Sequence, residues 1–149
     1  METSLQRLRI ATSLALATGL LAVVGCASMQ MGGMSSKAMK VTLAGSNEVP
    51  PVTTSATGSG TITINDDRSV SGTVTVTGMT PTAAHIHEAA IGANGPVIVP
   101  MTKTGDNAFT FPANAKLTDA QYASFKSGNL YVNVHSAANP GGEIRAQLK

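Results

Sequence analysis

The sequence predicts an all-β protein, an antiparallel Greek-key β-sandwich or flattened barrel of about eight strands with one short helix. Short runs rich in Val, Ile and Thr recur from residue 40 onward, and most of them alternate apolar with polar residues. Turns rich in Gly, Asn and Asp separate these runs. Because side chains alternate across a strand, this pattern gives each strand one face for a core and one face for solvent.

The elements follow from this pattern in order. Strands are expected over residues 40–43, 57–64, 70–77, 83–88, 96–101, 108–111, 130–136 and 143–148. A polar turn at 65–68 joins two of them as a hairpin. One helix is expected after Thr118, because Thr118 and Gln121 form a capping box and Gly128 supplies a left-handed end. Tyr122 and Phe125 would anchor this helix to the sheets.

Two segments precede the predicted domain. Residues 1–25 predict a lipoprotein signal peptide, because two arginines lead into an apolar run of about fifteen residues, too short to cross a bilayer comfortably. The run ends in Leu-Ala-Val-Val-Gly-Cys, which resembles a bacterial lipobox with Cys26 as the acylated residue. An ordinary signal peptide with a chance cysteine is the alternative. Residues 26–39, rich in Met, Gly and Ser, predict a flexible tether before the domain at 40–149.

The tether methionines have two interpretations: plain linker residues, or loose thioether ligands for Cu(I). Cys26 is the chain's single cysteine, so no intrachain disulfide is expected, although the predicted destination is oxidising. That destination is the bacterial cell envelope, with the protein lipid-anchored in the membrane. Ala27 follows Cys26 where aspartate would favour inner-membrane retention, so we expect the outer membrane, facing the periplasm.

The net charge of the chain argues against nucleic acid as a partner. Removing residues 1–25 takes away Arg7, Arg9 and Glu2, so ten basic residues become eight and eight acidic residues become seven. The mature chain is nearly neutral and has no basic stripe interleaved with aromatic residues. We therefore expect no nucleic-acid partner.

All three histidines of the chain fall in predicted strands. His85 and His87 lie two residues apart, so they share a face and stand roughly 6.6 Å apart along the strand. Ile86 takes the core side, which turns both histidines outward. Val134 also takes the core side, which turns His135 outward. If the two strands are neighbours, three imidazoles open to solvent converge on one transition metal, copper foremost and zinc as the alternative.

Other residues are candidates for supporting this site. Tyr131, Asn133, Glu143 and Arg145 alternate onto the outward face and could orient a ligand ring. Met101, at a strand end, is a candidate weak axial ligand, with a place in the core as its alternative.

Four separated motifs, in order, resemble the CHRD domain named after chordin, and the resemblance covers residues 40–149. They are Leu-Ala-Gly-Ser-Asn-Glu-Val-Pro-Pro-Val at 43–52, Ala-His-Ile-His at 84–87, Asn-Gly-Pro-Val at 94–97 and Leu-Tyr-Val-Asn-Val-His-Ser-Ala-Ala-Asn-Pro-Gly-Gly-Glu-Ile-Arg at 130–145. The resemblance implies a secreted or envelope protein.

A more distant resemblance links residues 70–81 and 84–88 to copper/zinc superoxide dismutase, an eight-stranded Greek-key sandwich. It implies that His85 and His87 match that family's strand pair of copper ligands and that His135 takes the later ligand's place. The sequence departs from that family in lacking a bridging fourth histidine, a zinc-ligand cluster and a cysteine pair. Arg145 follows a similar turn to the enzyme's anion-guiding arginine, with its register offset by one.

Three functions remain open. The first is a lipid-anchored envelope protein that binds copper through three histidines for storage, delivery or protection. The second is a mononuclear copper superoxide dismutase-like enzyme. The third is a metal-free binding or structural module. The partners expected under the first are the membrane, through the N-terminal lipid, and the metal ion.

Overall fold

Nine β-strands, one short α-helix and one turn of 3₁₀ helix build residues 36–149, the part of the chain that this computed structural model describes. The predicted signal peptide, Cys26 and the methionines at 29–34 lie outside these residues. The elements are β1 (Ser36–Ala44), η1 (Gly45–Asn47), β2 (Thr57–Asn65), β3 (Val70–Thr77), β4 (Pro81–Glu88), β5 (Val97–Pro100), β6 (Thr102–Gly105), β7 (Ala108–Thr110), α1 (Asp119–Lys126), β8 (Leu130–Ser136) and β9 (Ile144–Leu148).

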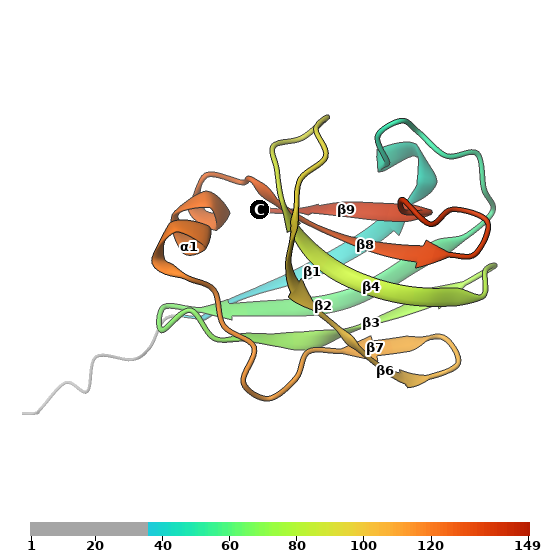
Figure 1. The fold of residues 1–149 in the computed structure, drawn as a ribbon. Helices are drawn as coiled ribbons and strands as arrows, with labels where there is room; N and C mark the ends of the chain where they lie inside the picture. Colours follow the sequence, from blue (N-terminus) through green and yellow to red (C-terminus); the bar gives the residue numbers. More distant parts are fainter. Residues whose placement is uncertain (1–35) are drawn as a thin grey trace, which may run out of the picture. The chain divides into compact units, whose positions relative to one another are not determined.

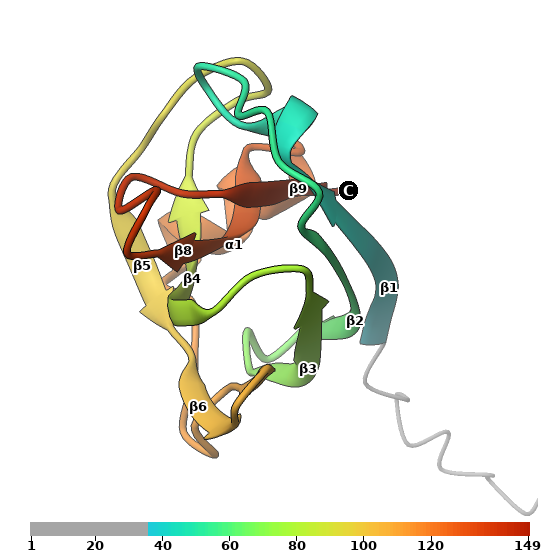
Figure 2. The ribbon, with the colours of Figure 1, turned by 90° about the vertical axis from the view of Figure 1, so that its right-hand side faces the viewer.

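The strands form one antiparallel sheet in the order β5-β4-β8-β9-β1-β2-β3-β7-β6. Its two outermost strands, β5 and β6, are consecutive along the chain and separated by Met101 alone. The Lys103 ammonium donates to the Pro81 carbonyl at 2.9 Å, which ties β6 back to β4. The sheet therefore nearly closes into a flattened barrel, with β4, β8 and β9 on one wall and β1, β2 and β3 on the other (Figures 1 and 2).

The core fills the space between these walls. In β1, Met39, Val41 and Leu43 are buried while the residues between them face outward, as a two-residue period requires. Val132 and Val134 in β8 are fully buried on the same inner side. Burying side chains of this size contributes about 1.5–3 kcal/mol each, so this alternation supplies the main stabilisation.

The all-β fold with one helix is confirmed, and β3 and β8 have the predicted bounds. One strand, β6, was not predicted. All four of its residues are exposed, so Thr-Lys-Thr-Gly carries no apolar alternation that could reveal it. Strand β1 also begins earlier than expected, at Ser36, and buries Met39, which had been assigned to the tether.

Helix α1 confirms the capping prediction. The Thr118 hydroxyl accepts from the Gln121 N–H, and the Gln121 side chain accepts from the Thr118 N–H. Gly128 has φ +74°, the left-handed conformation that ends the helix without strain. Phe125 is buried against the barrel, and α1 covers one end of it (Figure 1). Within the described part of the chain, no helix has the length and apolar character needed to cross a membrane.

Candidate metal centre

The structure brings the three histidines together. Strands β4 and β8 are neighbours, and their register sets His87 opposite Tyr131 and His135 opposite Ala83. The Nδ1 atom of His85 lies 3.0 Å from the Nε2 atom of His135. One ring nitrogen from each of the three histidines lies within 4.8 Å of the other two. The predicted convergence of the three rings is thus present.

Hydrogen bonds to backbone carbonyls determine how two of the rings are protonated. Nδ1 of His87 lies 2.9 Å from the carbonyl oxygen of Gly95, and Nδ1 of His135 lies 2.9 Å from that of Pro140. A carbonyl only accepts, so both Nδ1 atoms carry the proton and both Nε2 atoms, in the neutral rings, keep a lone pair. This is the arrangement that metal-binding histidines usually show.

The Nε2 atom of His87 has a further property that points to a ligand. It is buried and forms no well-aligned hydrogen bond in the described structure, with the Asn133 side chain as its polar neighbour. A buried nitrogen without a partner costs free energy, so such atoms in folded proteins call for a function or an unseen ligand. One ring nitrogen of His87 lies within 4.8 Å of one from His85 and one from His135, so a metal ion shared by the three rings could act as this ligand.

Electrostatics favour neutral rings at the site. Burial, followed by the neighbouring His135 and His87 rings, lowers the pKa of His85 from its ordinary 6.5 to about 4. Burial is also the main cause that lowers the pKa of His87, against the opposing effect of the Gly95 hydrogen bond. Both imidazoles are therefore neutral near pH 7, which is the form that binds a metal.

The spacing is close to that of a bound ion. Two nitrogens held at about 2.0 Å from one zinc or copper ion with tetrahedral angles lie about 3.3 Å apart. The His85–His135 pair is already at 3.0 Å. Closing the widest separation, 4.8 Å, by about 1.5 Å would bring all three nitrogens into bonding range. Metal binding through Nδ1 of His85 would replace the His85–His135 hydrogen bond and leave the His85 proton on Nε2.

The loop between β4 and β5, residues 89–96, carries the Gly95 carbonyl and is held by Arg145. The Arg145 guanidinium donates to the Asn94 side-chain oxygen at 3.2 Å, and the Asn94 amide donates to the Val49 carbonyl at 2.6 Å. The Gly95 N–H donates to the Tyr131 hydroxyl at 3.3 Å. A Cβ at Gly95 would lie 1.8 Å from a backbone oxygen, so this close packing requires glycine.

Tyr131 connects Arg145 to the metal centre. The His87 ring stacks on the Tyr131 ring at 4.8 Å between centroids and 8° between planes. The Arg145 guanidinium lies 3.3 Å from the Tyr131 centroid. Because β4 and β9 flank β8 on opposite sides, the tyrosine ring is sandwiched between histidine and arginine. This stack fixes the plane of the His87 ring.

The turn between β8 and β9, residues 137–143, carries the Pro140 carbonyl and is held by Glu143. The Ser136 and Thr54 hydroxyls both donate to the Glu143 carboxylate. The Asn139 N–H donates to the Ser136 hydroxyl at 3.1 Å, which fixes the start of the turn. The Ser136 hydrogen bond is also the main cause that lowers the pKa of Glu143, so the carboxylate is ionised near neutral pH.

Comparison with known families identifies this architecture. The chain matches the CHRD domain over residues 39–148. The chain belongs to the CHRD domain family. Comparison with curated proteins and with solved structures finds no match. The resemblance to copper/zinc superoxide dismutase therefore stays a prediction.

One expectation about the CHRD domain's histidines is wrong. They do lie on the face opposite the core, but they are not open to solvent as expected: His87 is 7 % exposed and His135 is 9 % exposed, while His85 is partly exposed. Alternation along a strand assigns a face and carries no information about loops that fold over it. Here the β4–β5 loop and the β8–β9 turn cover the outer face.

Met101 lies in the hydrophobic core cluster. Its N–H donates to the carbonyl of Ala84, a fully buried core residue of β4, at 3.0 Å. The structure thus favours the core alternative for Met101, and we do not include it in the metal centre.

A buried carboxylate, Glu48, adjoins the CHRD site through Asn133 and was not assigned to the site from the sequence. Asn133 is 1 % exposed, and its side chain interacts with both His87 and Glu48. Burial raises the pKa of Glu48, and the Arg145 charge opposes that effect. Gly142, at φ +132°, allows this packing, because an added Cβ would lie 2.6 Å from both side chains. The motif Asn-Pro-Gly-Gly was the one available signal, since paired glycines mark such close approaches.

Proposed function

We propose that this CHRD domain protein binds one copper ion through His85, His87 and His135, as a lipid-anchored envelope protein for copper storage, delivery or protection. The observation that carries the proposal is the paired orientation of His87 and His135. Both donate Nδ1–H to a backbone carbonyl, and a ring nitrogen of each lies within 4.8 Å of one from the other and of one from His85. Metal-binding histidines commonly donate their second ring N–H to a backbone carbonyl in this way.

Copper is proposed ahead of zinc on donor chemistry. Imidazole suits both metals, while a three-nitrogen site suits trigonal Cu(I) and leaves Cu(II) a position for a further ligand. The methionines at 29, 31 and 34 would add soft donors that favour Cu(I). Envelope location and lipid anchoring rest on the signal-peptide pattern and Cys26.

Calorimetric titration of the full chain, without a histidine tag, tests the site. We expect one Cu(II) per chain, and the substitution His87→Ala should lower the affinity at least about 100-fold, because removing one of three ligands leaves a weak two-coordinate site. Thr82→Ala is the matched control, since Thr82 is an exposed residue of the same strand. Equal copper affinity in His87→Ala and the control would contradict the proposal.

Elemental analysis identifies the physiological metal. Copper binds most such sites more tightly than zinc in the test tube, so relative affinity alone does not decide. Protein purified from the envelope without added metal should contain about one copper per chain and little zinc. Protein that carries neither metal, in cells supplied with both, would support the metal-free module instead.

The dismutase alternative is not favoured by the position of Arg145. The resemblance would assign Arg145 to guiding an anionic substrate. It is 2 % exposed, lies against the Tyr131 ring and donates to Asn94. An arginine committed to these contacts holds a loop in place, and we assign it that role.

A further inference from the structure

Four lysines and an exposed isoleucine surround two adjoining hollows beside the C-terminus. One hollow, of about 610 Å³, is lined by Lys40, Ile91 and Lys149 among others. The second, of about 510 Å³, is lined by Lys37 and Lys126 and shares Ile91 and Lys149 with the first. All four lysines are exposed, and Ile91 is 68 % exposed. We call these five residues the lysine face.

Apart from the C-terminal carboxylate of Lys149, carboxylates do little to neutralise the lysine face. Among the residues that line the two hollows, Glu48 has the one side-chain carboxylate, and it is 5 % exposed. Two of the lysines are also held in place. The Lys37 ammonium lies 5.7 Å from the Phe125 ring centroid, and the Lys126 ammonium lies 5.0 Å from that of Tyr122. The face therefore presents ordered positive charge around one exposed apolar side chain.

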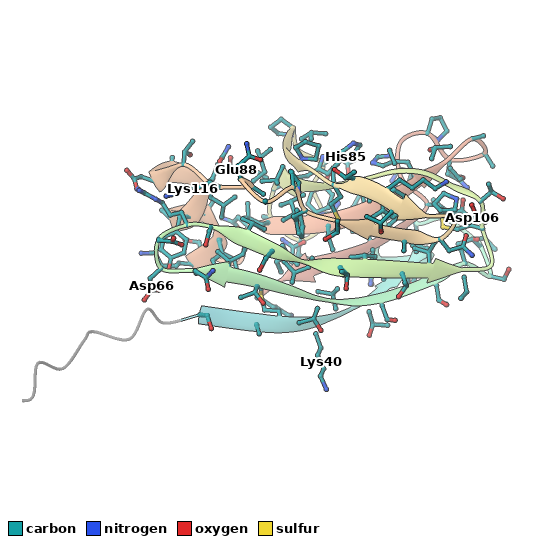
Figure 3. All side chains as sticks on the ribbon, turned by 90° about the horizontal axis from the view of Figure 1, so that it is seen from below. Lys40, Asp66, His85, Glu88, Asp106 and Lys116 are labelled. Atoms are coloured by element: carbon teal, nitrogen blue, oxygen red, sulfur yellow. The ribbon has the colours of Figure 1, made fainter. Side chains whose placement is uncertain are left out.

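The lysine face stands at the start of the folded domain. Strand β1 begins at Ser36, so nine residues, 27–35, and ten Cα-to-Cα steps separate the proposed lipidation site from the sheet. Ten such steps span at most about 35 Å when fully extended, so a lipid on Cys26 would keep Lys37 and Lys40 close to the bilayer. Figure 3 shows Lys40 projecting from the side of the domain opposite to His85.

We propose that the lysine face docks the domain on the anionic headgroups of the membrane that holds its lipid anchor; this inference rests on the envelope location in the proposed function. Lysines near an anionic bilayer are attracted to its phosphates, and Ile91 suits the headgroup boundary. Docking through Lys40 turns the side of the domain that carries His85 away from the bilayer.

Amine labelling of the full chain in vesicles tests the docking. The chain is reconstituted into neutral phosphatidylcholine vesicles, or into vesicles with about one third phosphatidylglycerol, and then treated with a membrane-impermeant acetylating reagent. Mass spectrometry reports the reactivity of each lysine. We expect the four lysines of the face to react at least about fivefold more slowly in anionic than in neutral vesicles, and about 0.5 M salt to abolish the difference. Lys116, an exposed lysine of another surface, is the internal reference.

A charge-matched pair of variants sharpens the test. Lys40→Glu should reduce the protection of Lys37 and Lys126, whereas Lys116→Glu should retain it, with Lys103 as the reference lysine in both of these variants. Equal reactivity of the lysine face in both kinds of vesicle overturns the docking proposal, and so does protection of Lys116 instead. A chain that sediments with neither kind of vesicle overturns the anchor as well. Neither result affects the copper titration, so failure of the metal site is detected separately.

Discussion

The β4–β5 loop and the β8–β9 turn perform the same task by different means. Each presents a backbone carbonyl 2.9 Å from the Nδ1 atom of a buried histidine. The loop is held by a cation, Arg145, through a contact with Asn94 that spans 51 positions of the chain. The turn is held by an anion, Glu143, through the Ser136 hydroxyl seven positions away and the Thr54 hydroxyl 89 positions away.

Because of this difference, we expect substitutions in the loop and in the turn to change the free energy of unfolding by different amounts. The β4–β5 loop depends on a buried guanidinium whose partners come from distant elements, so disturbing it should loosen the whole outer face of the sheet. The β8–β9 turn has two glycines and takes most of its hydrogen bonds from residues 136–142, with Thr54 as its distant partner, so a single backbone change should disturb mainly the turn itself. The substitutions below test these two expectations in order of expected size.

Removing the Arg145 side chain should have the largest effect. Arg145→Ala removes the Tyr131 stack and the Asn94 hydrogen bond, and leaves Glu48 buried without its cation. We expect the free energy of unfolding to fall by about 3 kcal/mol, measured by urea denaturation of the metal-free protein. Copper affinity should fall about 10–100-fold, because the Gly95 carbonyl loses its support.

Lys40→Ala, on the neighbouring strand β1, is the control for Arg145→Ala. Lys40 is exposed, so its loss should change the free energy of unfolding by no more than about 0.5 kcal/mol. An Arg145→Ala protein as stable as this control would show that Arg145 does not hold the loop.

Substitution of the adjacent glycines Gly141 and Gly142 is the corresponding test of the β8–β9 turn. Gly142→Ala places a Cβ 2.6 Å from the side chains of Asn133 and Glu48 at φ +132°, whereas a Cβ at Gly141 meets nothing within 4 Å. We expect Gly142→Ala to lower the free energy of unfolding by about 2 kcal/mol and Gly141→Ala to change it by about 0.5 kcal/mol or less. Equal thermal unfolding of the two variants would refute the close packing assigned to Gly142.

Tyr131→Phe isolates the hydroxyl that holds the loop at Gly95. The ring stack with His87 and Arg145 stays, and the Gly95 N–H loses its acceptor. We expect a loss of about 1 kcal/mol in stability and a loss of less than tenfold in copper affinity. Tyr122→Phe is the matched control, because its hydroxyl bonds Asp66 at an exposed position. Tyr122→Phe should leave copper affinity unchanged.

The sequence could predict the parts of the site that obey local rules. A two-residue period put His85 and His87 on one face, and the same period in β8 put His135 outward. The pairing of β4 with β8 was a condition of the predicted site, and the structure supplies it. The capping box of α1 is likewise local, since Thr118 and Gln121 stand three residues apart.

The burial of the histidines beneath the loops could not be predicted from the sequence. It depends on contacts between distant residues, which leave no repeating pattern along the chain. The residues from Ala89 to Pro96 show no alternation, yet Arg145 and Gln147 hold them over the outer face of β8 and β9. The position of Met101 depended on a register between β4 and β5 that the sequence does not specify.

The smallest expected effect is on the pH dependence of stability, to which His85 of β4 and Glu143 of the β8–β9 turn contribute in different pH ranges. The folded-state pKa of His85 is about 4 and its ordinary value is 6.5, so the unfolded chain binds more protons between these values. Stability of the metal-free protein should therefore fall as the pH drops from 6.5 towards 4. Glu143 has a lowered pKa, so the stability that it contributes is present above its ordinary 4.5 and is lost only below that.

Urea denaturation at pH 7 and pH 5.5 separates these two windows. His85→Gln should reduce the loss of stability between the two pH values, because the variant has no imidazole to protonate in the unfolded chain. Glu143→Gln should lose as much as the unchanged protein over this interval, since Glu143 stays ionised throughout it. If Glu143→Gln alone reduced the loss, proton uptake in this range would belong to the turn, and the histidine nitrogens would not be the neutral ligands that the copper site requires.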